Sequence, residues 1–274
     1  MPKCIFFTGA TGGLGQCCIK QLSSTGRYTI FACGTNEEKL TALGKYPGVI
    51  PVRADITRDE SVKTAREQVG THTGQLWAVV NFAGLTAFCS MVEGDCVNKA
   101  ESLLAVNVLG MARVNRFFFD LVQAGGGRII NCTSEAGWMA PPPFAAPYYL
   151  SKHAAEAYSD SLRRELLYLG IPVIKIQPGP YETRMTQSVE DMYRQTLANT
   201  RFYSRLLPRV KPFMDRELKK KNDPEDLARI VSKAIEAPHP RLQYRAGTSL
   251  LLRLFQLLPD RGVDAVYRIL GRCG

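Results

Sequence analysis

The sequence predicts an α/β fold built on one parallel sheet with helices on both faces. Two patterns predict it: short β-branched runs alternate with amphipathic helical stretches, and several of the runs are apolar throughout. Alternating strands and helices are typical of right-handed βαβ units, and strands without a polar face belong in a sheet that is covered on both sides. We therefore expect a doubly wound parallel sheet in a single domain, residues 1–274, with an elaborated C-terminus.

Seven runs are predicted as strands, and parts of the chain between them as helices. The strands are expected at residues 4–7, 28–33, 49–53, 77–81, 128–131, 173–177 and 242–245. Amphipathic stretches at 14–24, 61–69 and 99–123 are expected to be helices. Residues 183–223 break the alternation and are predicted to form an insertion over the end of the sheet, while residues 248–274 are apolar and basic with helical spacing.

Composition limits the classes of function that the chain can have. Of its 274 residues, 45% are hydrophobic and 22% charged, which is usual for a globular domain that needs neither disulfides nor a metal to fold. No apolar run approaches the roughly 20 residues that span a bilayer, and we expect no signal peptide because Thr8-Gly9 comes too early. The net charge of +10 is compatible with nucleic acid, an anionic membrane, an acidic ligand or mere solubility.

The eight cysteines and three histidines show no spacing typical of a zinc site. Cys4, Cys33 and Cys132 lie in apolar strand-like runs, where a thiol behaves as a small hydrophobic side chain. We therefore expect no metal site, and unpaired thiols favour a cytoplasmic location. The positive charges are dispersed except around residues 216–221, and no nucleic-acid-binding motif is recognised, so we expect no nucleic-acid partner.

A glycine-rich turn joins the first predicted strand to the first helix. It reads Thr8-Gly9-Ala10-Thr11-Gly12-Gly13-Leu14-Gly15, with the spacing G-x-x-x-G-x-G. Glycine permits a tight turn and lets the backbone approach a pyrophosphate, whose charge the helix N-terminus attracts. A purely structural turn is the alternative, but the strand–turn–helix context favours a Rossmann-type dinucleotide site.

Further motifs follow in order along the chain. They are Asn81-Phe82-Ala83-Gly84, Asn107, Tyr148-Tyr149-Leu150-Ser151-Lys152 and Pro178-Gly179-Pro180-Tyr181-Glu182-Thr183. With the glycine turn, they resemble the short-chain dehydrogenase/reductase superfamily over nearly all of the chain to about residue 185, and residues 154–166 look like its retinol and hydroxysteroid dehydrogenase branch. Two features depart from the family: Phe82 replaces a second Asn, and Ser134 lies 14 residues before Tyr148, one more than is usual.

The resemblance implies a role for each of four side chains. Tyr148 would be the acid/base, and Lys152 would bond the nicotinamide ribose. Ser134 would hydrogen-bond the substrate oxygen, and Asn107 would hold a water that links the lysine to solvent. A helix puts positions 148 and 152 on one face, and an ammonium group stabilises a phenolate. The plainer alternatives are a packed Tyr/Lys surface pair and a turn residue at 134. Tyr149 is the neighbouring candidate for the acid/base, but it has no lysine four residues further along the helix, whereas Tyr148 has Lys152 there.

A nicotinamide dinucleotide is the cofactor that the resemblance implies. Its predicted contacts are Gly9, Thr11, Gly12, Gly13, Leu14, Gly15, Gly34, Thr35, Asn36, Asp55, Ile56, Asn81, Ala83, Gly84, Tyr148, Lys152, Pro178, Gly179, Tyr181 and Thr183. NAD-binding folds usually carry a carboxylate at the end of the second strand, where this chain has Gly34. Thr35 or Asn36 can donate to a 2′-phosphate and no carboxylate repels it, so we expect NADP rather than NAD, although no arginine clamps the phosphate.

The C-terminal third of the sequence indicates a hydrophobic substrate. Residues 185–218 mix apolar and aromatic side chains with charge, and by resemblance residues 183–223 form a lid that suits a steroid-, retinoid- or lipid-like alcohol or carbonyl. The segment 248–274 fits three uses: capping the pocket, dimerisation or peripheral membrane association. An apolar stripe of Tyr158, Leu162 and Leu166 fits either a dimer interface or intrachain core. We expect a homo-oligomer, dimer or tetramer.

These observations predict an NAD(P)(H)-dependent oxidoreductase that interconverts a hydroxyl and a carbonyl group. The cofactor would carry the hydride while the protein supplies position and electrostatics. A catalytically silent nucleotide sensor or scaffold with the same fold is the alternative hypothesis. The presence of Ser134, Tyr148 and Lys152 argues against it, since a protein that only binds has no need of an acid/base pair.

Overall fold

Seven parallel strands form one sheet at the centre of the protein. In this computed structural model, which describes residues 2–181, 184–218, 222–248 and 250–272, the strand order is β3-β2-β1-β4-β5-β6-β7. The strands are β1 (Lys3–Thr8), β2 (Tyr28–Gly34), β3 (Val49–Arg53), β4 (Ala78–Asn81), β5 (Arg128–Cys132), β6 (Val173–Pro178) and β7 (Gln243–Ala246). Each predicted run forms a strand whose ends lie within one residue of those expected, and the predicted fold class is confirmed.

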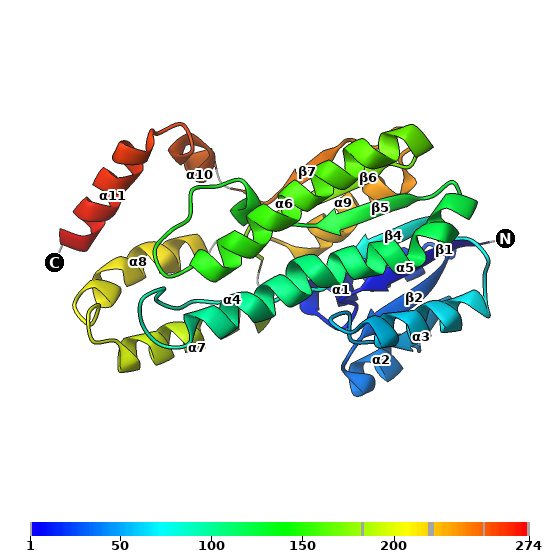
Figure 1. Cartoon of the computed structure of the whole chain (residues 1–274), viewed down its shortest axis with the longest axis horizontal. Helices are drawn as coiled ribbons and strands as arrows, with labels where there is room; N and C mark the ends of the chain where they lie inside the picture. The colour runs from blue at the N-terminus through cyan, green and yellow to red at the C-terminus, as the bar shows by residue number, and fades with distance from the viewer. Residues whose placement is uncertain (1, 182–183, 219–221, 249, 273–274) are drawn as a thin grey trace.

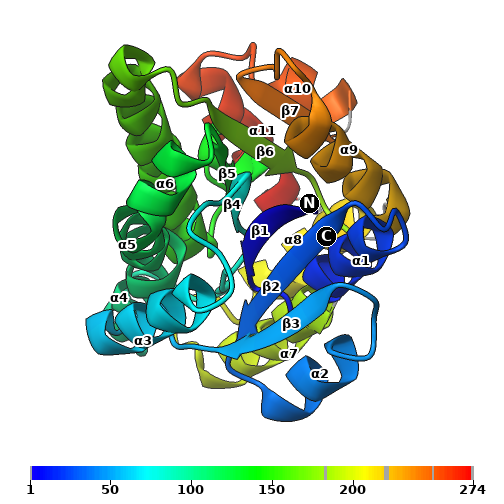
Figure 2. The ribbon, with the colours of Figure 1, turned by 90° about the vertical axis from the view of Figure 1, so that its right-hand side faces the viewer.

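Helices cover both faces of the sheet (Figure 2). One face carries α1 (Gly13–Ser23), α2 (Glu37–Leu43) and α9 (Pro224–Glu236), and the other carries α3 (Asp59–Gly70), α5 (Met111–Ala124) and α6 (Ala146–Leu166). Ile5 and Phe7 join the core on the first face, whereas Phe6 joins the core on the second. Because successive strand side chains point to opposite faces, the unbroken apolar run of β1 fills both cores at once.

The helix predicted at residues 99–123 is continuous but contains a wider turn in its middle. α4 (Cys96–Leu104) passes into the π-helical segment η1 (Ala105–Gly110), which passes into α5. A π-turn inserts an extra residue into the helical repeat and is frequently found at functional sites. Asn107 lies within η1 and is fully buried, so the irregular turn carries one of the predicted site residues.

The segment predicted as an insertion forms helices at the carboxyl end of the sheet, where the C-terminal helices also lie (Figure 1). They are α7 (Arg184–Asn199), α8 (Leu206–Leu218), α10 (Leu250–Phe255) and α11 (Asp260–Arg272). A third apolar cluster forms here from Phe88, Phe144, Tyr193 and Leu207. α11 packs on α8, where Arg209 Nη1 donates to the carbonyl of Gly271 at 3.0 Å.

The apolar stripe on α6 packs inside the chain. Leu166 is buried in the core of the second face and Leu162 packs against that core, while the Tyr158 hydroxyl accepts a hydrogen bond from Asn115 Nδ2 at 3.1 Å. Of the two alternatives for this stripe, the structure therefore supports intrachain core. Among the helices in the described ranges, none is both long and apolar enough to cross a membrane.

Candidate active site

The four predicted catalytic residues meet at the carboxyl edge of the sheet. Ser134 follows β5 and precedes the short helix η2 (Glu135–Gly137). Tyr148 and Lys152 lie one turn apart on α6, and Asn107 comes from η1. Lys152 is buried, and its Nζ donates to the carbonyl oxygen of Cys132 at 3.3 Å. The same Nζ lies 5.8 Å from the centre of the Tyr148 ring, as the four-residue spacing predicts.

Asn107 joins the loop after β4 to α6. Its Oδ1 accepts a hydrogen bond from the Leu85 N–H at 2.7 Å, and its Nδ2 donates to the Leu85 carbonyl and to Ser151 Oγ, both at 2.9 Å. Both amide hydrogens are thereby used, so a water held by this side chain would have to donate to Oδ1. A Cβ on Gly84 would lie 3.4 Å from Asn107 Oδ1 and 3.7 Å from Lys152 Nζ, which places this glycine against both groups.

Ser134 has a structural role that does not exclude a catalytic one. Its Oγ accepts a hydrogen bond from the Ala136 N–H at 3.2 Å and so caps η2. The hydroxyl also donates to the Pro178 carbonyl over a long 3.4 Å, across from β5 to the end of β6. A hydrogen bond of this length is weak, because O–H···O bonds are usually about 2.5–3.0 Å long. A substrate oxygen that came closer than the Pro178 carbonyl would therefore be the better acceptor for the Ser134 hydroxyl hydrogen.

The loop between Ser134 and Tyr148 is strained at one residue. Phe144 has a φ of 65°, and no other non-glycine residue in the described ranges has a positive φ. Its carbonyl accepts a hydrogen bond from the Cys89 N–H at 2.8 Å, and its ring lies 5.6 Å from that of Phe88. Strained backbone of this kind clusters at active sites and persists where surrounding contacts hold it, and here those contacts come from the third apolar cluster.

The glycine turn forms a cradle that fits a dinucleotide pyrophosphate. Gly9 has a φ of +68°, and a Cβ there would lie 2.5 Å from Ala83 N, so only glycine lets the turn approach the loop after β4. Thr8 Oγ1 holds that loop by accepting hydrogen bonds from the N–H groups of Phe82 and Ala83 at 3.2 and 3.3 Å. α1 begins without a capping side chain and without an acidic residue in its first turn, so its N-terminus can receive an anion.

Thr11 fills the space beside Gly34 at the end of β2. A Cβ on Gly34 would lie 2.8 Å from Thr11 Cγ2 and 2.9 Å from Thr11 Oγ1, so a carboxylate at position 34 would collide with this threonine. Thr35 is exposed. Asn36 caps α2 through Oδ1, which accepts a hydrogen bond from the Lys39 N–H at 2.9 Å, and this leaves its amide hydrogens for a ligand.

Asp55 and Ile56, predicted beside the adenine, follow β3. Asp55 Oδ1 accepts hydrogen bonds from the hydroxyl and the N–H of Thr57 at 2.7 and 2.9 Å. These bonds hold the pKa of Asp55 below its usual value, because they favour the ionised carboxylate. Ile56 is buried against η1, where a Cβ on Gly110 would lie 2.7 Å from Ile56 Cδ1.

Some predicted cofactor contacts have side chains that face the interior. Asn81 Nδ2 donates to Asn115 Oδ1 at 2.7 Å and to Asn131 Oδ1 at 3.0 Å, and all three residues are buried. Tyr181 belongs to the core of the first face, and burial raises its pKa to about 12. Both side chains brace the edge of the sheet from within. Gly179 donates through its N–H to the Ala246 carbonyl at 2.7 Å, while Thr183 lies outside the described residues.

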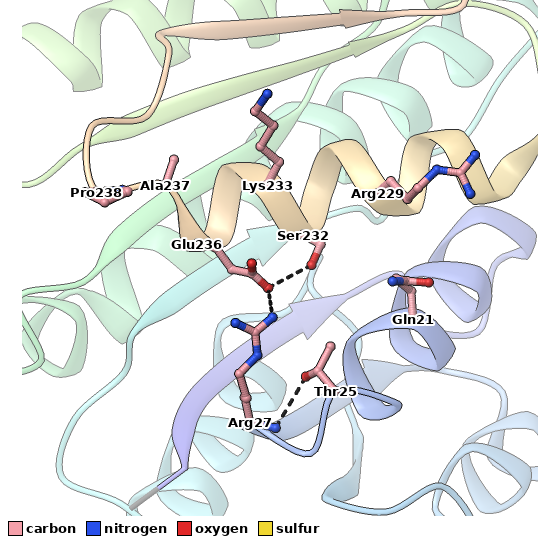
Figure 3. A pocket seen from close by; sticks show the side chains of 9 residues that line it. All are labelled: Gln21, Thr25, Arg27, Arg229, Ser232, Lys233, Glu236, Ala237 and Pro238. Carbon is pink, nitrogen blue, oxygen red and sulfur yellow. Dashed lines mark hydrogen bonds and ion pairs between the residues drawn. The ribbon is translucent and has the colours of Figure 1, made fainter.

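A surface cavity of about 600 Å³ lies between α1, the turn before β2 and α9 (Figure 3). Its lining residues are Gln21, Thr25, Arg27, Arg229, Ser232, Lys233, Glu236, Ala237 and Pro238. Arg27 Nη2 pairs with Glu236 Oε1 at 2.5 Å, and none of the lining residues was predicted for catalysis or cofactor binding. Within the described ranges, no group of His, Cys, Asp or Glu side chains could hold a metal ion.

Sequence reasoning missed three side chains that hold the site together. Thr8 binds the loop after β4, and Ser151 accepts from Asn107. Glu156 lies one turn beyond Lys152 on α6, is buried, and has partners on both carboxylate oxygens. The spacing 148, 152 and 156 puts Glu156 on the same helical face as the predicted catalytic pair, which was the signal available in the sequence.

Known proteins resemble this chain along most of its length. The family model of the short chain dehydrogenases matches residues 3–194. Retinol dehydrogenase 16 of Mus musculus is 32% identical over 284 aligned residues, which cover 96% of this chain and 87% of the relative. The 17-beta-hydroxysteroid dehydrogenase type 6 of Rattus norvegicus is also 32% identical over 284 residues, which cover 97% of this chain and 88% of the relative.

Solved structures share the fold at lower identity. A short chain dehydrogenase/reductase from Burkholderia phymatum in complex with NAD has a TM-score of 0.77 at 22% identity, over 97% of this chain and 95% of that one. An alcohol dehydrogenase from the archaeon Thermococcus sibiricus, complexed with 5-hydroxy-NADP, has a TM-score of 0.73 at 20% identity, over 89% and 96%. Likeness at this level of identity establishes the fold.

Proposed function

The chain belongs to the short-chain dehydrogenase family, and on that premise we propose that it interconverts a hydroxyl and a carbonyl group on a hydrophobic substrate. As a member of this family it is an oxidoreductase that acts on CH–OH groups with NAD or NADP. One observation carries the assignment of the site: the buried Lys152 ammonium lies beside Tyr148 and against Gly84, at the sheet edge that the glycine turn also reaches.

The residues around Lys152 divide the proton chemistry between them. The dinucleotide supplies or accepts the hydride when it is bound. Tyr148 delivers a proton to the carbonyl oxygen during reduction and takes it from the hydroxyl during oxidation, while the positive charge of Lys152 stabilises the phenolate. Ser134 turns its hydroxyl from Pro178 to the reacting oxygen, where negative charge develops. Asn107 keeps the loop after β4 fixed to α6, so that the lysine and its surroundings stay in place.

NADP is the dinucleotide that we propose for this site. Two observations support it: Gly34 offers no carboxylate to repel a 2′-phosphate, and Thr11 occupies the space that a carboxylate would need. Thr35 is exposed and Asn36 keeps its amide hydrogens after capping α2, so both can donate to the phosphate. The N-terminus of α1 and the glycine turn would hold the pyrophosphate.

A steroid-, retinoid- or lipid-like substrate fits the apolar surroundings of the site. Phe144 lies shortly before Tyr148, and its ring is 5.1 Å from that of Tyr203, which belongs to the connection between α7 and α8. The same connection is fastened to the loop after β4, because Glu93 accepts hydrogen bonds from the Thr200 hydroxyl at 2.6 Å and the Arg201 N–H at 2.7 Å. Two relatives are named for retinol and hydroxysteroid substrates, which supports the same class.

The proposal includes a homo-oligomer in the cytoplasm that associates peripherally with membranes. Exposed Leu254, Leu257 and Leu258 lie beside exposed Arg253 and Arg261, and apolar side chains flanked by arginines suit an anionic lipid surface. Sedimentation with anionic vesicles at low salt tests the membrane contact, and a clean failure to sediment would remove it. Equilibrium ultracentrifugation measures the oligomeric state, and a monomer at micromolar concentration would contradict it.

Nicotinamide absorbance with a panel of steroids, retinols and aliphatic or aromatic ketones tests the function. Tyr148→Phe should lower kcat by about a thousandfold while dinucleotide affinity changes little. Tyr149→Phe is the matched control, because Tyr149 is the neighbouring phenol and burial raises its pKa; its kcat should stay close to that of the wild type. Near-full turnover by Tyr148→Phe would refute the role of this residue.

A further inference from the structure

Glu156 is a buried carboxylate with a partner on each oxygen. Its Oε1 accepts hydrogen bonds from Thr133 Oγ1 at 2.5 Å and from Gln177 Nε2 at 2.8 Å. Its Oε2 pairs with Lys175 Nζ at 2.7 Å. A buried carboxylate is costly unless it is paired and hydrogen-bonded, and this one meets both conditions.

The partners of Glu156 are the neighbours of site residues on two different strands. Thr133 immediately precedes Ser134 at the end of β5, and Gln177 immediately precedes Pro178-Gly179 at the end of β6. Glu156 itself lies on α6, one turn after Lys152. One carboxylate therefore ties together the three segments that carry the predicted substrate donor, the acid/base pair and the loop predicted beside the nicotinamide.

Close packing around Gly137 tightens the same junction. A Cβ on Gly137 would lie 2.6 Å from Glu156 Cγ and 2.8 Å from the Lys152 carbonyl oxygen. The turn that follows Ser134 therefore lies directly against the backbone of α6, with no room for a side chain between them. Displacing Glu156 would move this turn as well as the two strand ends.

Lys175 pairs with two carboxylates, Glu156 and Asp160, and within the described residues only the first of them also contacts the strand ends at the site. Burial alone would lower the pKa of Lys175, but hydrogen bonds to Asp160 and Glu156 raise it overall. Asp160 Oδ1 lies 2.8 Å from Lys175 Nζ, on the same helix and one turn beyond Glu156. The two carboxylates thus share one ammonium group. In the part of the chain that the structure describes, Glu156 also accepts hydrogen bonds from the ends of β5 and β6, whereas Asp160 does not.

We propose that Glu156 is a positioning residue that sets Ser134 and the Pro178-Gly179 loop relative to Lys152 on α6, and thereby orders the nicotinamide half of the site. The inference rests on the proposed function, since it assigns that half to the dinucleotide. The glycine turn, which would hold the pyrophosphate, and Asp55, which would lie beside the adenine, have no contact with this carboxylate in the described structure. Removing Glu156 should therefore disturb one half of the site and spare the other.

Comparing the affinity for the whole dinucleotide with that for its adenosine fragment shows which half of the site is disturbed, and it needs no turnover. Calorimetry of NADPH and of adenosine 2′,5′-bisphosphate, which lacks the nicotinamide riboside and one phosphate of the pyrophosphate, gives the ratio of the two affinities. In Glu156→Ala the affinity for NADPH should fall about fivefold or more, with fragment affinity unchanged. In Asp160→Ala both affinities should stay within about twofold, because this variant weakens the pairing of the same lysine without touching the strand ends.

Turnover supplies a second readout that a merely structural role would not move. A misplacement of about 1 Å can cost a hundredfold in rate. At saturating NADPH, and at a temperature where all variants are folded, kcat of Glu156→Ala should therefore fall ten- to a hundredfold, while the KM for the carbonyl substrate stays nearly unchanged. Glu156→Gln keeps an oxygen for Thr133 and Gln177 but loses the ion pair with Lys175. It should therefore restore kcat and the affinity ratio, although its melting temperature is lowered.

The outcomes of these experiments decide whether Glu156 positions the site or only stabilises the fold. Equal affinity ratios and equal kcat losses in Glu156→Ala and Asp160→Ala would overturn the positioning role, as would a Glu156→Gln variant as impaired as the alanine. Should Glu156→Ala fail to fold, Thr133→Val removes one donor in an isosteric side chain, and it should shift the ratio in the same direction; an unchanged ratio overturns the inference. A wild type that binds NADPH but turns over no substrate contradicts the proposed function while the ratio still tests Glu156.

Discussion

An aspartate at position 34 tests how the end of β2 selects the dinucleotide. NAD-binding folds place a carboxylate there to bond the ribose hydroxyls, and this chain has Gly34 with Thr11 packed against it. The informative perturbation is the double variant Thr11→Ala with Gly34→Asp, compared with each single change. We expect the double variant to exchange a preference for NADP for a preference for NAD.

The distances around Gly34 show why the single change is insufficient. A Cβ there would lie 2.8 Å from Thr11 Cγ2, 2.9 Å from Thr11 Oγ1 and 3.4 Å from Thr11 Cβ. Gly34→Asp alone therefore overpacks the turn, which typically costs about 1–3 kcal/mol and lowers the melting temperature by roughly 2–4 °C for each kcal/mol. Thr11→Ala removes the two nearest atoms and leaves a contact of ordinary length, so the double variant should recover most of this loss.

The change in selectivity follows from charge. Two unit negative charges about 5 Å apart repel by about 3 kcal/mol at an effective dielectric constant near 20, which corresponds to roughly a hundredfold in kcat/KM for NADP. The assay is kcat/KM with NADPH and NADH on one substrate from the panel, with Thr11→Ala as the control for the loss of the hydroxyl. A folded double variant that retains the wild-type preference would refute the reasoning, because the carboxylate would then not face the 2′ position.

Three further predictions concern stability. Asn107→Leu should lower the free energy of unfolding by about 3 kcal/mol, because burial leaves its hydrogen-bond partners unsatisfied; a denaturant titration that shows a loss below about 1 kcal/mol contradicts this. Gly137→Ala should cost about 1–3 kcal/mol, since its Cβ would lie 2.6 Å from Glu156 Cγ, and an unchanged melting temperature would refute the clash. The pKa of Glu93 is lowered, chiefly by the hydrogen bond from Thr200, because this bond favours the ionised carboxylate. The ionised Glu93 therefore stabilises the folded protein fully above the ordinary carboxyl pKa, near 4.3, and this stabilisation is lost as the pH falls through the lowered pKa. The difference in melting temperature between wild type and Glu93→Gln should accordingly be largest at neutral pH and shrink below about pH 4; a difference that grows in acid would reverse the sign.

The strands could be predicted closely because their signal is local. β1 is apolar at consecutive positions, and Phe6 and Phe7 are buried on opposite faces; only a sheet covered on both sides accepts such a run. The helix at 99–123 was predicted without its π-turn, because the buried positions Leu103, Asn107 and Gly110 keep the three- to four-residue spacing of a regular helix. The stripe at Tyr158, Leu162 and Leu166 left two alternatives open, because an apolar face on a helix does not say what covers it.

Contacts between distant parts of the chain account for what the sequence did not reveal. The sequence shows only that Gly34 stands where NAD-binding folds have a carboxylate. The atoms that exclude a side chain there belong to Thr11, on a turn that lies beside β2 only after β1 and β2 have paired. Tyr181 fits a motif, yet the packing of α1 and α9 determines that its side chain is buried.

Glu156 shows the same dependence at the site itself. The spacing of positions 148, 152 and 156 puts this glutamate on the face of the predicted catalytic pair, but a glutamate on a helix is most often solvated, so the spacing alone does not predict that it is buried. The pairing of β5 with β6 sets Cys132 beside Ile176, so the next residues, Thr133 and Gln177, emerge together at the carboxyl edge. There they face the turn of α6 that carries Glu156. The register of two parallel strands, fixed by apolar packing along their whole length, thus decides that this glutamate joins the site and does not face solvent.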